Sequence, residues 1–163
     1  MIPRREQPHF GVYSVKDGKV RLVSTDFTGP NGIAFSPDEK KLYIIDTGAS
    51  EGPDNPAHMR VFDVDHDAGT LSNSKVFADF KPGFSDGVRC DTAGNVWCSM
   101  GWADPKEDGA RCYAPNGDMI GKIHVPETCA NLTFGGQQRN RLYICGSTSV
   151  YAVYTSAQGA LKP

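Results

Sequence analysis

Short runs of alternating apolar and polar residues follow one another along nearly the whole chain. Gly, Asp, Asn or Pro interrupts the alternation between runs. A period of two is typical of strands with one buried face, and the interrupting residues favour tight turns. The segments GVYSV and KVRLVS, joined by KDG, show the arrangement clearly. The pattern predicts an all-β protein built from consecutive hairpins, with almost no helix.

One pattern occurs three times. The segments that begin at Asn31, Asp86 and Asn131 each place a polar residue before a short apolar strand, a turn and a second strand. Their starting residues lie 45 to 55 positions apart. That spacing leaves room for about four strands in each unit, which is the size of one β-propeller blade.

The repeats predict how the chain is organised. We expect an irregular segment over residues 1–10 and a partial β-propeller over residues 11–163. The predicted blade repeats cover about 11–25, 26–80, 81–127 and 128–163. The first of these is only the outer hairpin of a four-stranded blade. The chain would therefore hold about three to three and a half blades, roughly half of a six-bladed ring.

Charge and hydropathy narrow the class of function. The net charge is −2, the pI is near 6.0, and Lys and Arg are scattered, which argues against a nucleic-acid partner. No apolar run is long enough to span a bilayer, and MIPRREQPHF lacks the apolar core of a signal peptide. The sequence as written predicts a cytoplasmic protein, or a periplasmic or secreted one if an upstream signal segment has been lost.

The three repeat starts are candidate metal ligands. The beginning of each innermost propeller strand can face the central channel, so Asn31, Asp86 and Asn131 are expected to converge. Carboxylate and amide oxygens suit Ca²⁺, whereas zinc favours His or Cys. The five cysteines contain no CxxC pair, and most lie in strand-like runs, where we expect small buried side chains. Pro-Asn-Gly and Asp-Gly also fit ordinary turns, so a structural role stays open.

Three longer stretches carry a family resemblance: GPNGIAFSPDEKKLYIIDTG, FSDGVRCDTAGNVWCSMG and CANLTFGGQQRNRLYICGS. They resemble the last three blades of the SMP-30/gluconolactonase/LRE-like family, and the resemblance extends from residue 10 onward. It implies a six-bladed β-propeller with a divalent metal, often Ca²⁺, in the central channel. It also implies hydrolysis of sugar lactones, with relatives that act on other esters and on organophosphates.

The resemblance assigns roles to two residues. Asn31 matches the family's PNG asparagine, and Asp86 matches its DG aspartate, which implies that both bind the metal and that Asp86 is also the catalytic base. The second motif reads Ser85-Asp86-Gly87 rather than PDG. The family's remaining ligands, a Glu and a second Asn, have no counterpart in this chain. The implied reaction is attack of water on a metal-polarised lactone carbonyl, with Asp86 taking the proton.

Three further residues are candidates for contact with the substrate or with the side chains that bind the metal. Asn131 has the register of the ligands, although it also begins a formal glycosylation sequon and fits a structural role. His58 ends a Pro- and Gly-rich loop that could border the channel, or could be a plain surface loop. Trp102 follows an inner strand and could line a sugar pocket.

Two other functions stay open. The chain could be a non-catalytic, truncated propeller fragment with an incomplete metal site, or a same-family esterase or phosphotriesterase. We expect a small-molecule lactone as partner, with no nucleic acid and no membrane. We also expect self-association, because a blade without a neighbour exposes its apolar face.

Overall fold

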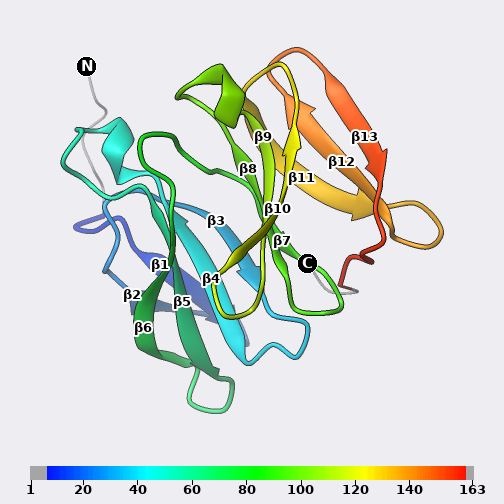
Figure 1. Cartoon of the computed structure of the whole chain (residues 1–163). Helices are drawn as coiled ribbons and strands as arrows, with labels where there is room; N and C mark the ends of the chain where they lie inside the picture. Colours follow the sequence, from blue (N-terminus) through cyan, green and yellow to red (C-terminus); the bar gives the residue numbers. More distant parts are fainter. Residues whose placement is uncertain (1–6, 161–163) are drawn as a thin grey trace.

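Four antiparallel sheets stand side by side in the computed structural model, which describes residues 7–160 (Figure 1). Their strands are β1 (Val12–Lys16), β2 (Lys19–Ser24), β3 (Pro30–Phe35), β4 (Lys41–Asp46), β5 (His58–Asp65), β6 (Thr70–Asp79), β7 (Val88–Cys90), β8 (Val96–Met100), β9 (Gly109–Tyr113), β10 (Met119–His124), β11 (Cys129–Gly135), β12 (Arg141–Gly146) and β13 (Val150–Tyr154). Two short 3₁₀ turns, η1 (Gly48–Ser50) and η2 (Pro105–Glu107), interrupt the loops.

Each sheet is a meander in which neighbours in sequence are neighbours in space. The sheets are β1-β2, β3-β4-β5-β6, β7-β8-β9-β10 and β11-β12-β13. Two complete blades are thus flanked by a two-stranded hairpin and by a three-stranded sheet. This arrangement confirms the predicted all-β, propeller-type fold with about three to three and a half blades. Of the predicted irregular segment 1–10, residues 7–10 form no strand, and the rest lies outside the described residues.

Turn residues explain the predicted hairpins. Asp17 and Gly18 between β1 and β2 both have positive φ, 52° and 71°. A two-residue hairpin turn with positive φ at both positions matches the right-handed twist of the strands, and Asp-Gly is among its favoured sequences. The local sequence therefore favours the turn of this hairpin, and packing of Val12 in a core cluster holds it in place.

The hydrophobic core lies between the sheets. Strand β4 contributes side chains to two of its clusters. Tyr43 and Ile45 join the cluster that lies between the β3–β6 and β7–β10 sheets, whereas Leu42 and Ile44 join the cluster beneath the β1-β2 hairpin. A further cluster lies between the β7–β10 and β11–β13 sheets. Because successive side chains of a strand point to opposite faces, a run of apolar residues serves two interfaces at once.

The cysteines follow the prediction with one exception. Cys90, Cys98, Cys112 and Cys129 are buried, and burial raises the pKa of the Cys98 thiol to about 12. Cys145 is exposed, which corrects the expectation that a cysteine in a strand-like run is buried. It lies on the outward face of β12, where no neighbouring sheet covers it within the described residues.

The described part of the chain contains no helix that is long and apolar enough to cross a membrane.

Candidate functional site

The starts of three inner strands meet at one end of the sheets. Asn31 is the second residue of β3, Asp86 lies just before β7, and Asn131 is the third residue of β11. The Asn31 side-chain amide Nδ2 donates a hydrogen bond to Asp86 Oδ1 at 2.8 Å and lies 3.5 Å from Thr47 Oγ1. Two residues 55 positions apart in the sequence are therefore in direct contact, as the repeat predicts.

Two glycines allow the inner strands to approach so closely. A Cβ atom built on Gly32 would lie 1.9 Å from the backbone oxygen of Asp86, and one on Gly87 would lie 2.3 Å from Asn131 Oδ1. Neither distance leaves space for a side chain. The glycine after each polar residue in PNG and DG thus brings the polar residues of neighbouring blades together. Close packing between blades therefore explains why glycine follows the polar residue in both motifs.

Bulges in the inner strands accompany these polar residues. The register of the β3–β4 pair shifts between Pro30 and Ile33, and that of the β11–β12 pair shifts between Cys129 and Asn131. A bulge redirects a side chain that regular alternation would place elsewhere, and bulges are common beside active sites. Asn31 therefore lies in a bulged strand rather than in a tight turn, which was the structural alternative for Pro-Asn-Gly.

Asp86 is held through its backbone. The backbone N–H groups of Asp86 and Gly87 donate to Ser99 Oγ at 3.3 and 3.0 Å, and the Ser99 N–H donates to the Gly87 carbonyl at 3.0 Å. Ser99 is fully buried. These bonds fix the position of Asp86 and leave its carboxylate available to the site. No motif in the sequence indicates this role for Ser99.

The Asp86 carboxyl is partly buried, and its pKa is raised from its ordinary value. Burial is the larger cause, and the hydrogen bond from Asn31 opposes it. None of the ion pairs among the described residues includes Asp86. The site thus contains a carboxylate without a cationic partner in the described part of the chain, in a place where its charge is costly.

A second aspartate positions Asn31. Asp46, the last residue of β4, is fully buried, and its carboxylate accepts backbone N–H bonds from Thr28, Gly29 and Gly48 at 2.9, 2.8 and 2.8 Å. Those bonds hold the segment that leads into Asn31. Sequence reasoning missed this role, although an aspartate that ends the apolar run KLYII is a signal for a satisfied buried carboxylate.

Asn131 lies beside the pair formed by Asn31 and Asp86. It packs against Gly87, and its Oδ1 accepts the backbone N–H of Leu132 at 2.9 Å. That bond ties the side chain to its own strand. Its place in the predicted cluster follows the repeat, and its role as a group behind the ligands stays a prediction.

The other two candidates, His58 and Trp102, lie at the start of β5 and in the loop after β8. His58 begins β5 and pairs in register with Asp46 and Asp79. Its Nε2 is buried without a hydrogen-bond partner in the described residues, and burial lowers its pKa. Trp102 is 47% exposed with a φ of 61°, and its N–H lies 3.5 Å from Thr128 Oγ1. Among residues 7–160, no hydrogen bond joins His58 or Trp102 to the Asn31–Asp86 pair.

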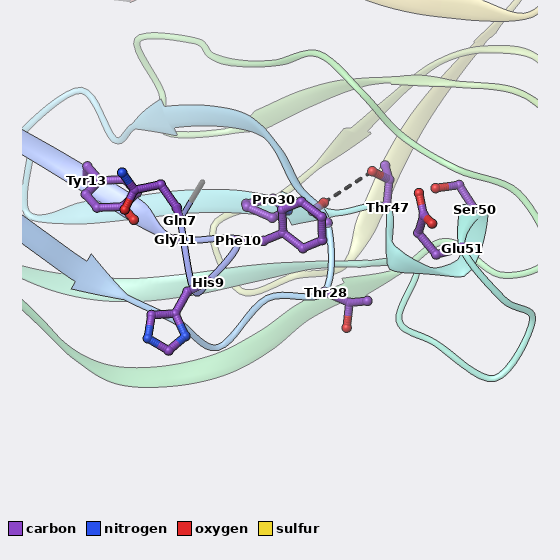
Figure 2. Close-up of a pocket in the computed structure, with 11 residues that line it drawn as sticks. Gln7, His9, Phe10, Gly11, Tyr13, Thr28, Pro30, Thr47, Ser50 and Glu51 are labelled. Atoms are coloured by element: carbon purple, nitrogen blue, oxygen red, sulfur yellow. Dashed lines mark hydrogen bonds between the residues drawn. The ribbon is translucent and has the colours of Figure 1, made fainter. Parts of the chain in front are cut away.

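A groove lies close to Asn31. Thr47 shows this position, since it approaches Asn31 and also lines the groove. Figure 2 shows Phe10 and Pro30 on one side and Ser50 and Glu51 on the other. Its volume is about 520 Å³. The lining residues are Gln7, His9, Phe10, Gly11, Tyr13, Thr28, Gly29, Pro30, Thr47, Ser50 and Glu51. The sequence analysis did not predict this groove, since residues far apart in the sequence form it.

The residues present fit part of a hard-cation site. Asn31 and Asp86 lie in direct contact and offer amide and carboxylate oxygens, the ligand types that Ca²⁺ takes. Within residues 7–160 there is no cluster of three or more His, Cys, Asp or Glu side chains that could hold a metal. Asn31 and Asp86 therefore supply a minority of the six to eight oxygens that surround Ca²⁺.

The fold and the converging inner strands define a partial β-propeller of the kind that gathers polar groups on a central axis. Residues 3–148 match the family described as SMP-30/Gluconolactonase/LRE-like region. The chain belongs to this family. The family membership predicted from the sequence is thus confirmed over most of the chain.

Named relatives agree with this membership. The chain is 26% identical over 166 residues to a gluconolactonase of Zymomonas mobilis, covering 95% of this chain and 43% of that protein. It is 30% identical over 132 residues to a pentonolactonase of Haloferax volcanii, covering 78% and 41%. The chain thus spans less than half the length of these relatives.

Solved structures share the fold. A gluconolactonase from Xanthomonas campestris superposes with a TM-score of 0.78 at 30% identity, over 93% of this chain and 46% of that one. A calcium-binding protein, regucalcin, from Agrobacterium tumefaciens superposes with a TM-score of 0.75 at 23% identity, over 94% and 55%. The second likeness shows the fold alone.

Proposed function

We propose that this chain carries the catalytic half of a sugar-lactone hydrolase of the gluconolactonase type. The observation that carries the proposal is the contact between Asn31 and Asp86 across two blades. Gluconolactonase and pentonolactonase are the names of its relatives, and the chain covers part of each. The substrate class that we propose is therefore a small sugar lactone.

Asn31 and Asp86 would hold a divalent metal, and Ca²⁺ is the ion that we propose from their oxygen chemistry. When bound, such an ion supplies Lewis-acid polarisation of a carbonyl and stabilises negative charge on its oxygen. Asp46 acts on the site indirectly, because its three backbone hydrogen bonds fix the segment that precedes Asn31.

Asp86 is proposed as the general base. Its carboxylate takes a proton from a water molecule while the water oxygen forms a bond to the lactone carbonyl carbon. The bond between that carbon and the ring oxygen then breaks, and the ring oxygen takes the proton from Asp86. Burial keeps the pKa of Asp86 above its ordinary value, which makes the carboxylate a stronger base at neutral pH than an exposed aspartate.

A non-catalytic fragment is the second candidate function. It is favoured by one observation, the absence of a complete metal-ligand cluster within residues 7–160. In that case the fold persists, while the metal binds too weakly to support turnover.

The two functions are separated by measuring metal binding and turnover on the same chain. Calorimetric titration with Ca²⁺ and proton release from glucono-δ-lactone are the two measurements. We expect Asp86→Asn to lower turnover by about 100-fold or more, as for the loss of a general base. We expect Asn31→Ala to weaken Ca²⁺ binding at least tenfold. Asn116→Ala is a matched control, since Asn116 lies in an exposed turn and bonds to Asp118.

Ca²⁺ binding without chelator-sensitive turnover would support the non-catalytic fragment. Turnover that survives in Asp86→Asn would reject Asp86 as the base. A same-family esterase or phosphotriesterase would instead hydrolyse aryl esters or phosphotriesters faster than the lactone.

A further inference from the structure

One loop supplies the polar side of the groove near the Asn31–Asp86 pair. This loop, residues 47–57, joins β4 to β5 and contains the 3₁₀ turn η1. Its side chains in the groove are two hydroxyls and one carboxylate, those of Thr47, Ser50 and Glu51. Figure 2 shows Ser50 and Glu51 across the groove from the aromatic ring of Phe10. The groove therefore has a polar side and an aromatic side.

Backbone hydrogen bonds hold this loop in a defined shape. The Ser50 N–H donates to the Thr47 carbonyl at 3.0 Å. The Ala49 N–H donates to the Pro56 carbonyl at 2.7 Å, which ties the start of the loop to its end. A loop whose backbone is bonded to itself presents its side chains in fixed positions, and this lowers the entropy cost of binding a ligand. Ser50 and Glu51 are thus preorganised.

Close packing also brings the loop against the segment that leads into β3. A Cβ atom built on Gly48 would lie 2.5 Å from Thr28 Cβ, which leaves no space for a side chain. Thr28 and Gly29 line the groove together with the loop. Glycine at position 48 therefore allows two segments that are distant in the sequence to form one continuous lining.

The groove continues to the Asn31–Asp86 pair through Thr47. The Thr47 hydroxyl donates to the Gly29 carbonyl at 3.2 Å and lies 3.5 Å from Asn31 Nδ2. Pro30, which precedes Asn31 in β3, lines the groove as well. A molecule with its reacting carbon at the pair can therefore place its other atoms in the groove.

The lining has the chemistry that binds a small polyhydroxylated ring. Phe10 and Pro30 offer apolar surface to the C–H groups of such a ring, while Ser50 and Glu51 offer hydrogen-bonding oxygens to its hydroxyls. A carboxylate is the stronger acceptor, because hydrogen bonds to ionised groups exceed those between neutral groups. The groove volume of about 520 Å³ lies within the range of small-molecule sites.

The charge of Glu51 distinguishes among such rings. None of the ion pairs among residues 7–160 includes Glu51, so no cation of the described chain neutralises its carboxylate through such a pair. A neutral hydroxyl donates a hydrogen bond to this group. A phosphate or sulfonate at the same place on the ligand is repelled by it.

We propose that the groove binds the hydroxyl-bearing part of the substrate, and that Glu51 selects neutral sugar lactones over lactones with an anionic substituent. The inference rests on the proposed function, because it places the lactone carbonyl at the Asn31–Asp86 pair. The ring then lies against Phe10, and its hydroxyls donate to the Glu51 carboxylate. Glu51 takes no proton in the reaction, so it determines specificity and does not act as a base.

Selectivity is measured as the ratio of kcat/KM for D-glucono-δ-lactone to kcat/KM for its 6-phosphate, with Ca²⁺ present. We expect Glu51→Gln to lower this ratio by about fivefold, and Glu51→Lys to lower it further, because each change removes repulsion. Asp54→Asn is the matched control. Asp54 is exposed in the same loop but does not line the groove, so its loss should leave the ratio unchanged. An equal ratio in wild type and Glu51→Lys would overturn the proposal.

A binding measurement separates this proposal from the proposed catalysis. The probe is 1,5-anhydro-D-glucitol, a neutral sugar ring without a carbonyl, titrated into the ¹⁵N-labelled full chain with chelator present. We expect the backbone amide signals of Ser50 and Glu51 to shift. Binding should weaken about tenfold in Glu51→Gln, as for the loss of a charged acceptor, and stay unchanged in Asp54→Asn. The dispersion of the same spectra checks that each variant folds.

The outcomes are distinct. Shifts at Ser50 and Glu51 without any lactone turnover would support the groove as a sugar site and reject the proposed catalysis. Turnover with no shift in the loop, or with shifts confined to other parts of the chain, would overturn the groove assignment and leave the catalysis standing. Binding of the probe that is equally strong in wild type and Glu51→Gln would reject Glu51 as the selecting residue.

Discussion

Two aspartates at one end of the blades do different work because their surroundings differ. Asp46 is fully buried and satisfied by three backbone N–H groups. Asp86 is partly buried and accepts one side-chain hydrogen bond, from Asn31. The first arrangement uses its charge for the fold, and the second leaves charge available for a ligand. The two residues therefore respond to substitution in opposite directions.

Removing the Asp86 charge is expected to stabilise the fold. Its pKa is raised in the folded state, so the folded chain binds the proton more tightly than the unfolded chain. Its stabilising contribution is complete below the unfolded pKa of about 4 and is lost as the pH rises through the folded pKa. Asp86→Asn should therefore raise the melting temperature by about 1–3 °C at neutral pH.

The check is a pair of melts at pH 7 and near pH 4, with chelator present. The gain from Asp86→Asn should shrink at the lower pH, where a larger fraction of the wild-type carboxyl is protonated because its pKa is raised. An equal gain at both values would assign the effect to packing instead of charge.

Removing the Asp46 acceptor is expected to destabilise the fold. Asp46→Ala leaves the N–H groups of Thr28, Gly29 and Gly48 without their acceptor inside the protein. We expect a loss of about 3 kcal/mol, because each unsatisfied buried donor is costly. Urea denaturation measures it. Asp46→Asn keeps an acceptor oxygen and should lose less, and equal losses would contradict the hydrogen-bond explanation.

At the scale of elements, the site depends on how closely the inner strands approach. The bulges in β3 and β11 and the glycines in PNG and DG act together, because the bulge redirects the polar side chain and the glycine lets the next blade come near. The distance between blades thus depends on glycines that have no functional side chain.

The substitution Gly32→Ala tests whether the close approach of neighbouring blades requires glycine. Its added methyl group would meet the Asp86 carbonyl, so the blades must separate. We expect a loss of about 2–3 kcal/mol in the free energy of unfolding and a weaker metal site. Gly52→Ala is the control, since a Cβ there meets only Asn55 at 3.4 Å. Equal stability of the two variants in urea would show that the contact between the two blades tolerates a methyl group.

At the scale of the whole molecule, the described residues 7–160 cover the middle blades on both faces and the outer sheets on one. The residues of the cluster between β3–β6 and β7–β10 are nearly all inaccessible, for example Ile45, Met59 and Val88. On β13, the last strand, Val150 and Tyr154 are mostly exposed. Local stability should follow this difference in burial.

Native-state hydrogen exchange measures that difference. Amides of β4 and β8 should exchange slowly, because neighbouring sheets cover both faces of these strands. Amides of β13 should exchange several-fold faster, because Val150 and Tyr154 leave one face of this strand exposed. Equal protection of β4 and β13 would contradict the link between burial and local stability.

Much of the fold could be predicted because its signals are local. Alternation in VYSVK and a Gly after Asp17 determine a strand and a turn whatever surrounds them. The repeat of a polar residue before an inner strand likewise indicated that Asn31 and Asp86 are equivalent, and their contact follows from that equivalence. The exposure of Cys145 could not be predicted in this way, since alternation does not say whether another sheet covers a face.

What the sequence by itself determined is the class of fold, the family and the equivalent positions of Asn31 and Asp86 in their repeats, because short-range periodicity and motif spacing encode them. Only the tertiary structure decided the rest. Ser99 and Asp46 support the site through bonds to backbone groups, and the groove beside Thr47 combines distant segments. The exposure of apolar side chains on the β1-β2 hairpin and on β13 also depends on packing. Burial, desolvation and contact between blades are properties of the folded chain as a whole, so residue order reveals them only once the sheets are in place.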